Sequence, residues 1–154
     1  MKRLKVLVID SNPIIFIGLK SVFKNSSVFE VFMHINELDK LNEILVQSKV
    51  DLIISEINFN NNNISQILKN FKKNKIEIPL VVFTSKSNEK KSVKLLKDGC
   101  SGFITKDLRK KSLRKAIQEI AFSKYGSDEQ NKFTRLKNRF NFDYNVEKLN
   151  SLSK

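Results

Sequence analysis

The chain has 154 residues, 40% of them hydrophobic, which suits one domain with a buried core and a short appendage. No apolar run approaches the ~18 residues of a membrane span, and a single cysteine, Cys100, excludes an internal disulfide and a thiolate zinc site. The net charge of +13 is interpreted first as a solvated surface with a coding bias toward Lys, Asn, Ile and Phe, and second as a sign of a polyanionic partner such as nucleic acid. The N-terminus lacks the long apolar stretch of a signal peptide, so we predict a cytoplasmic protein without membrane contact.

Strand-like and helix-like patterns alternate along the chain. Short apolar or alternating runs predict five strands, at 4–9, 28–33, 50–57, 79–84 and 102–105. Apolar residues at helical spacing predict five helices, around 14–23, 38–45, 64–71, 93–96 and 113–120. Each helix is long enough to cross between parallel strands, and right-handed crossovers give an open parallel sheet with helices on both faces.

Polar side chains directly follow four of the predicted strands. They are Asp10, Glu56, Thr84 and Lys106. Ligands of open parallel sheets bind at the carboxyl ends of the strands, so we expect these four residues to share one site. The single histidine, His34, has no second histidine or acidic cluster beside it, and we predict a surface or cap position rather than a ligand or base role.

Two segments resemble a known family. Residues 5–19 begin Lys-Val-Leu-Val-Ile-Asp-Ser-Asn-Pro and resemble the first strand and helix of bacterial response-regulator receiver domains. Residues 95–107 end Gly-Phe-Ile-Thr-Lys-Asp and resemble the fifth-strand signature of the branch that usually carries a LuxR/NarL-type helix-turn-helix output domain. The resemblance covers about residues 3–122. It implies an α/β, flavodoxin-like, doubly wound sheet of five parallel strands in the order 2-1-3-4-5, with five helices.

The resemblance also implies roles for individual residues. In the family, two adjacent acids and an aspartate after the third strand hold Mg²⁺, and that aspartate accepts a phosphoryl group from a histidine kinase. Asp10 matches one of the acids, and Asn58 matches the position whose backbone carbonyl binds the metal. Thr84 and Phe103 match the switch pair, and Lys106 matches the lysine that binds the phosphoryl oxygens.

Two positions depart from the family pattern. Ser11 stands where the second acid is expected, and Glu56 stands at the phosphoacceptor position. Because Mg²⁺ requires near-ideal oxygen coordination, a site made from Asp10, Glu56 and Asn58 is predicted to be weak or lost, so no cofactor is expected. The extra methylene of Glu56 moves its carboxylate outward by roughly 1 Å, toward Lys106 and Thr84 and out of line for attack.

These departures lead to a first hypothesis and two alternatives. The first is an atypical, phosphorylation-independent receiver that acts through protein–protein contacts in signalling or transcriptional control and is not an enzyme. In it, Glu56 either mimics a phospho-aspartate or forms an inert ion pair with Lys106. The alternatives are a DNA-binding regulator that uses the basic fourth and fifth helices, and a phosphate-binding or phosphoaccepting protein with residual Mg²⁺-dependent chemistry.

The sequence also predicts domain limits and partners. Residues 1–122 form the receiver-like domain, and residues 123–154 form a basic, amphipathic, helical tail. A helix-turn-helix output domain needs roughly 60 residues, so the tail is too short to contain one. We expect a protein partner such as a histidine kinase or a transcription component, and a homodimer, with nucleic acid as the alternative partner.

Overall fold

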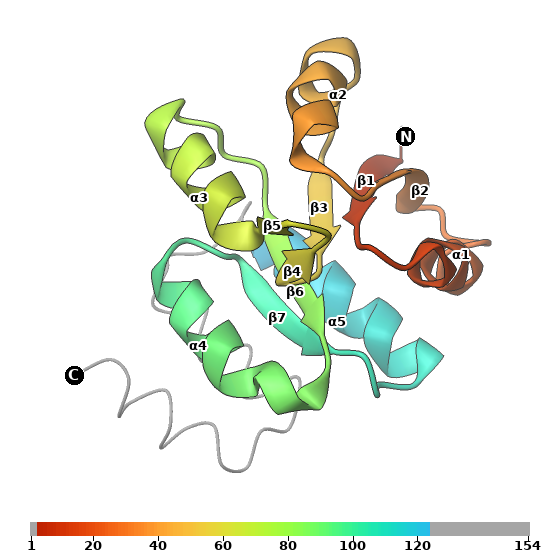
Figure 1. The fold of residues 1–154 in the computed structure, drawn as a ribbon. Coiled ribbons are helices and arrows are strands. Elements are labelled where there is room, and N and C mark those ends of the chain that lie inside the picture. Colours follow the sequence, from red (N-terminus) through yellow and green to blue (C-terminus); the bar gives the residue numbers. More distant parts are fainter. Residues whose placement is uncertain (1–2, 124–154) are drawn as a thin grey trace.

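The computed structural model describes residues 3–123, which form a five-stranded parallel sheet covered by helices on both faces (Figure 1). The strands of the sheet are β1 (Leu4–Ile9), β2 (Phe29–Ile35), β3 (Leu52–Ser55), β6 (Leu80–Thr84) and β7 (Gly102–Thr105). Their order is β2-β1-β3-β6-β7. The predicted α/β class and the predicted order 2-1-3-4-5 of the main strands are therefore confirmed.

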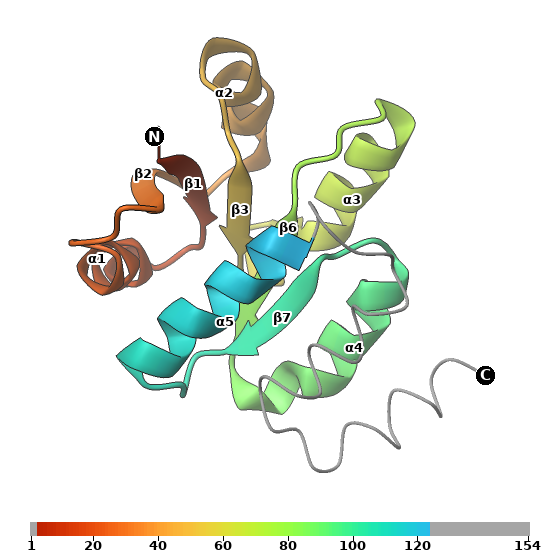
Figure 2. The same ribbon diagram turned by 180° about the vertical axis from the view of Figure 1, so that it is seen from behind.

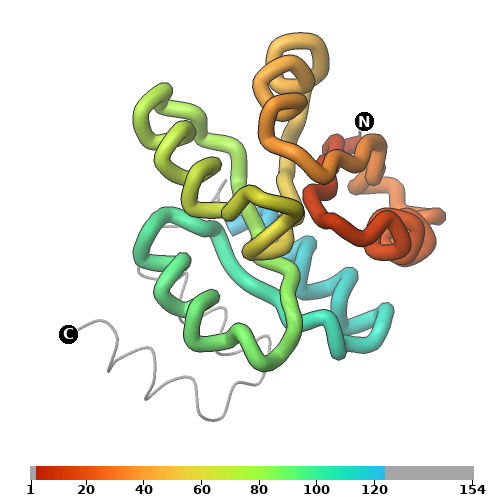
Figure 3. The backbone as a smooth tube through the Cα atoms, viewed as in Figure 1, coloured from red at the N-terminus to blue at the C-terminus, as the bar shows by residue number. Residues whose placement is uncertain are grey.

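Five α-helices connect the strands, and their succession is easy to follow along the tube in Figure 3. They are α1 (Pro13–Val22), α2 (Leu41–Gln47), α3 (Ile64–Lys73), α4 (Glu89–Lys97) and α5 (Lys110–Ser123). Short 3₁₀ turns, η1 (Leu38–Lys40) and η2 (Lys86–Asn88), precede α2 and α4. Helix α5 contacts α1 and crosses the sheet face that is nearer the viewer in Figure 2. Within residues 3–123 no helix has the length and apolar character needed to span a bilayer.

Burial explains why these segments form strands. Every residue of β3, β6 and β7 is buried, as expected for parallel strands that are covered on both faces. Strand β2 lies at one edge of the sheet and buries only three of its seven residues, and β7 lies at the other edge. The predicted strand at 28–33 ends two residues later in the structure, at Ile35.

Polar caps set the start of the helices near the carboxyl edge of the sheet. The Asn12 side chain accepts a hydrogen bond from Ile14 N at 3.0 Å, and Pro13 begins α1, where its missing N–H has no cost. The Asn-rich segment between β3 and α3 forms a small antiparallel hairpin of β4 (Asn58–Phe59) and β5 (Asn62–Asn63). The Asn63 side chain then caps α3 by accepting from Ser65 N at 2.8 Å.

The turn between α4 and β7 requires glycine at two points. Gly99 has a φ of 120°, a conformation that side-chain-bearing residues rarely adopt, and it follows the last turn of α4. At Gly102 the backbone of β7 lies close beneath α5, because a Cβ at this position would be 2.7 Å from Cδ1 of Ile120. The absence of a side chain at Gly102 therefore allows α5 to pack directly on the edge strand.

The predicted tail, apart from Ser123 at the end of α5, lies outside the described residues. The division of the chain at residue 122 stays a prediction.

Candidate functional site

Two carboxylates and one ammonium group meet at the carboxyl ends of β1, β3 and β7. Lys106 Nζ lies 2.9 Å from Oδ2 of Asp10 and 3.0 Å from Oε1 of Glu56. The main chain positions these residues, since Glu56 N donates to Ile9 O at 2.9 Å and Lys106 N donates to Thr84 O at 2.8 Å. The structure thus brings together three of the four residues that the sequence analysis assigned to this edge.

This ion-pair cluster is partly shielded from water. The exposed fraction of the side chain is 5% for Asp10, 19% for Glu56 and 25% for Lys106. Burial alone would lower the pKa of the Lys106 ammonium, but hydrogen bonds to Asp10 and Glu56, together with their charges, outweigh it and raise the pKa above the usual 10.5. Lys106 is therefore held in its charged form.

Both oxygens of the Glu56 carboxylate have partners. While Oε1 binds Lys106, Oε2 accepts a hydrogen bond from the adjacent main chain, Ile57 N, at 2.7 Å. The Ser55 hydroxyl donates to the Glu56 carbonyl oxygen at 2.8 Å and braces the same turn. The longer glutamate side chain thus folds back against its own backbone while it reaches the lysine.

Asp10 is fixed by the loop that leads into α1. Its Oδ1 accepts from Asn12 N at 2.8 Å, and its carbonyl oxygen accepts from His34 Nε2 at 2.8 Å. His34 is half-buried and stacks on Phe16 with ring centroids 5.5 Å apart. His34 thus lies within β2, partly buried, and its ring binds a main-chain carbonyl rather than a metal or a substrate group. This position follows from the length of β2, which extends two residues beyond its predicted end and pairs His34 with Val8 of β1.

The remaining residues of the predicted metal site have other contacts. The Ser11 hydroxyl accepts from Asn60 N at 2.7 Å, and the Asn58 side chain is exposed and accepts from Asn63 Nδ2 at 2.7 Å. Among residues 3–123 no group of three or more His, Cys, Asp or Glu side chains is arranged to hold a metal ion. With one carboxylate missing and the Lys106 ammonium between the other two, these residues do not fit Mg²⁺.

The predicted switch residues, Thr84 and Phe103, are fully buried beside the cluster. The Thr84 hydroxyl accepts a hydrogen bond from Asn88 Nδ2 at 3.0 Å, and the Asn88 carbonyl accepts one from the Ser92 hydroxyl of α4 at 3.0 Å. Thr84 is thus bonded toward α4, whereas the sequence suggested a bond to Glu56. The sequence analysis did not identify Asn88, because nothing in the sequence indicates which hydrogen-bond partner a polar loop residue will have.

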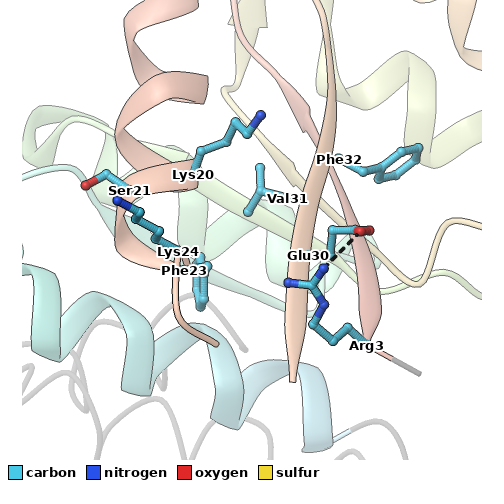
Figure 4. A pocket seen from close by; sticks show the side chains of 8 residues that line it. All are labelled: Arg3, Lys20, Ser21, Phe23, Lys24, Glu30, Val31 and Phe32. Atoms are coloured by element: carbon cyan, nitrogen blue, oxygen red, sulfur yellow. Dashed lines mark hydrogen bonds and ion pairs between the residues drawn. The ribbon is translucent and has the colours of Figure 1, made fainter. Parts of the chain in front are cut away.

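A cavity of about 680 Å³ lies between α1 and β2, away from the cluster (Figure 4). Its lining includes Arg3, which directly precedes β1, and Glu30, which lies near the start of β2. These two residues form a salt bridge of 3.3 Å. The cluster lies where the strands end, so this cavity is not part of the candidate site.

Comparisons with known proteins agree with this architecture. The family model described as response regulator receiver domain matches residues 6–118. The nitrate/nitrite response regulator protein NarL of Escherichia coli K12 is 25% identical over 116 residues, which are 75% of this chain and 54% of that protein. A homologue of that regulator in Haemophilus influenzae is 24% identical over 119 residues, which are 77% of this chain and 57% of that protein. The chain therefore spans about half the length of the curated relatives it matches.

Solved structures share the fold. The receiver domain of a two-component response regulator from Bacteroides fragilis superposes with a TM-score of 0.69 at 20% identity, covering 78% of this chain and 98% of that one. RcsB from Salmonella enterica superposes with a TM-score of 0.67 at 16% identity, covering 77% of this chain and 60% of that one. From the family match and this shared architecture, we conclude that the chain belongs to the response regulator receiver domain family of two-component signalling.

Proposed function

We propose that this receiver acts without phosphorylation and that Glu56 permanently supplies the negative charge that a phosphoryl group would bring. The observation that carries the proposal is the contact of Glu56 with Lys106 at 3.0 Å, at the position where the family has its phosphoacceptor. The second Glu56 oxygen accepts a hydrogen bond from the main chain at 2.7 Å, so both oxygens are held in place by partners and are not aligned by a metal for attack.

The charge balance of the site supports the same conclusion. A receiver that transfers phosphate needs a divalent cation to offset the charges of its carboxylates and of the incoming phosphoryl group. Here the Lys106 ammonium contacts both Asp10 and Glu56, and Ser11 provides no charge where the family has its second acid. Lys106 thus acts as an internal counter-ion, and the site is complete without a metal or a phosphate.

The switch residues connect this site to α4. Thr84 and Phe103 are buried, and Asn88 bonds the Thr84 hydroxyl to the start of α4. We propose that this arrangement is the working conformation and that the protein signals through contacts with a protein partner, such as a histidine kinase or a transcription component, in the cytoplasm. The structure of RcsB shows that protein bound to promoter rprA in the presence of the phosphomimetic BeF₃⁻. In this chain the Glu56 carboxylate would be the built-in counterpart of such a group.

Phosphoryl uptake tests the proposal directly. The wild-type protein is incubated with acetyl phosphate and Mg²⁺ and its mass is measured. We expect no adduct, whereas a variant that carries Glu56→Asp and Ser11→Asp should gain one phosphoryl group of about 80 Da. The single variant Glu56→Asp is the control for side-chain length alone. A stable phosphoryl adduct on Glu56 of the wild-type protein would overturn the proposal and favour the phosphoaccepting alternative.

Hydrogen exchange separates a mimic from an inert ion pair. If the charge of Glu56 maintains the conformation around Thr84, Glu56→Gln should increase amide exchange in α4 and β7, while the exposed control Glu77→Gln should not. Unchanged exchange in Glu56→Gln would identify an inert pocket. The predicted homodimer is tested in the same samples by light scattering, where a monomer mass at all concentrations would remove it.

A further inference from the structure

The helices α4 and α5 flank β7, the edge strand of the sheet (Figures 1 and 2). Both helices carry exposed cations. We call these cations, with those of the two adjoining loops, the basic edge face. It comprises Lys86, Lys90, Lys91, Lys94, Lys97, Arg109, Lys110, Lys111, Arg114 and Lys115, all of them exposed. The acids on the same segments are Glu89, Asp98, Asp107 and Glu119, so the face has a net charge of +6 out of +13 for the chain.

A coding bias alone does not explain this distribution, because a bias would load all exposed helices alike. Helices α4 and α5 hold eight Lys and Arg residues in 23 positions, and α3 holds three, Lys69, Lys72 and Lys73, in ten. Helices α1 and α2 hold one, Lys20, in 17 positions, and expose apolar side chains such as Ile14 and Val46. Positive charge is therefore concentrated on α3, α4 and α5, and its largest share lies on the two helices that flank β7.

The charges of the basic edge face are directed to solvent. The four salt bridges between described residues use Arg3, Lys49 and Lys106 as their cations, so none of them uses a cation of this face. Unpaired surface cations attract mobile counter-ions, and a polyanion that displaces those ions gains the entropy of their release.

We propose that the basic edge face binds the phosphate backbone of duplex DNA without sequence preference. Protein–DNA interfaces are polar and strongly positive, as this face is. Protein–protein interfaces have an apolar core instead. Within residues 3–123, three of the four large exposed hydrophobic side chains, Ile14, Ile17 and Val46, lie on other helices, and only Phe122 lies on α5. Two copies of this face would repel each other, so a second copy of the chain is a poor occupant.

The proposal is independent of Glu56 and adds a binding activity to the receiver itself. Since phosphate contacts carry no sequence information, the expected complex is weak, sequence-independent and steeply salt-dependent.

Binding is measured with the full chain and a fluorescently labelled random duplex of about 20 base pairs, by anisotropy between about 50 and 200 mM salt. The face variant carries Lys90→Gln, Lys94→Gln and Lys111→Gln. The control variant carries Lys69→Gln, Lys72→Gln and Lys73→Gln, which remove the same charge from exposed positions of α3. Circular dichroism verifies that both variants are folded.

The face variant should lose at least about tenfold in affinity at low salt, with a salt slope lower by up to about 3, because each lost phosphate contact removes about one unit. The control variant should stay within about twofold of the wild type. Equal losses in the two variants, or no binding of the wild type at about 50 mM salt, would overturn the proposal. Equally tight binding of poly-glutamate would overturn it in favour of an acidic protein partner.

Discussion

Lys106 and the cations of the basic edge face have similar ionic groups but opposite surroundings. Lys106 is three-quarters buried and contacts two carboxylates within 3.0 Å, whereas the cations on α4 and α5 are exposed and form none of the salt bridges between described residues. The charge of Lys106 is therefore used inside the domain, and that of the basic edge face is available to a partner. The role of a lysine in this domain therefore depends on the carboxylates around it in the structure, and not on whether it lies in a basic stretch of the sequence.

The largest expected effect comes from removing the internal counter-ion. Lys106→Met leaves Asp10 and Glu56 as neighbouring, partly buried carboxylates without a cation, and should lower the free energy of unfolding by about 3 kcal/mol. Urea denaturation measures this change. The matched surface variant Lys110→Met should stay within about 0.5 kcal/mol of the wild type, and equal losses in the two variants would remove the distinction between the two classes of lysine.

A smaller effect is expected when the charge of one carboxylate is removed. Glu56→Gln keeps the size of the side chain and an oxygen that can accept from Lys106, but it loses the ionic part of that bond. The free energy of unfolding should fall by about 1 to 2 kcal/mol, measured by urea denaturation. Glu77→Gln, on an exposed loop residue, is the control and should have little effect. An unchanged stability in Glu56→Gln would mean that Asp10 alone holds Lys106.

The smallest effect is a loss of stability at alkaline pH. The pKa of Lys106 is higher in the folded protein than the usual 10.5, so its contribution is fully present below pH 10.5 and is lost as the pH rises through the folded pKa. The stability difference between wild type and Lys106→Met should therefore shrink at pH values above 10.5. A difference that stays constant through this range would show that Lys106 is not stabilised as a cation.

Most of the sheet could be predicted from the sequence because β3, β6 and β7 are buried throughout and read as continuous apolar runs, whereas β2 is only partly buried. The ends of the strands were harder to predict, because buried apolar residues continue beyond the residues that form the strand hydrogen bonds. Val50 and Ile57 are buried but lie outside β3, which is Leu52–Ser55 rather than 50–57. Pro79 precedes β6 because it has no N–H to donate to a neighbouring strand.

At the site, the sequence identified the residues but not all of their partners. The carboxyl ends of parallel strands lie at one edge by geometry, which made the meeting of Asp10, Glu56 and Lys106 predictable. The bonds of Thr84 to Asn88 and of Glu56 to its own backbone depend on loop conformation and side-chain rotamers, which leave no periodic signal in the sequence.

The bare backbone at Gly102 has a consequence for the basic edge face. Helix α5 packs so close to β7 that a Cβ at position 102 would lie 2.7 Å from Cδ1 of Ile120, so the Ile120 side chain or the helix would have to shift. Helix α4 contacts the same strand, so any shift of α5 away from β7 would change the separation between the cations of the two helices. Gly102→Ala would therefore change the packing of α5 without altering any charge, and it shows whether DNA binding depends on the spacing of the cations as well as on their number.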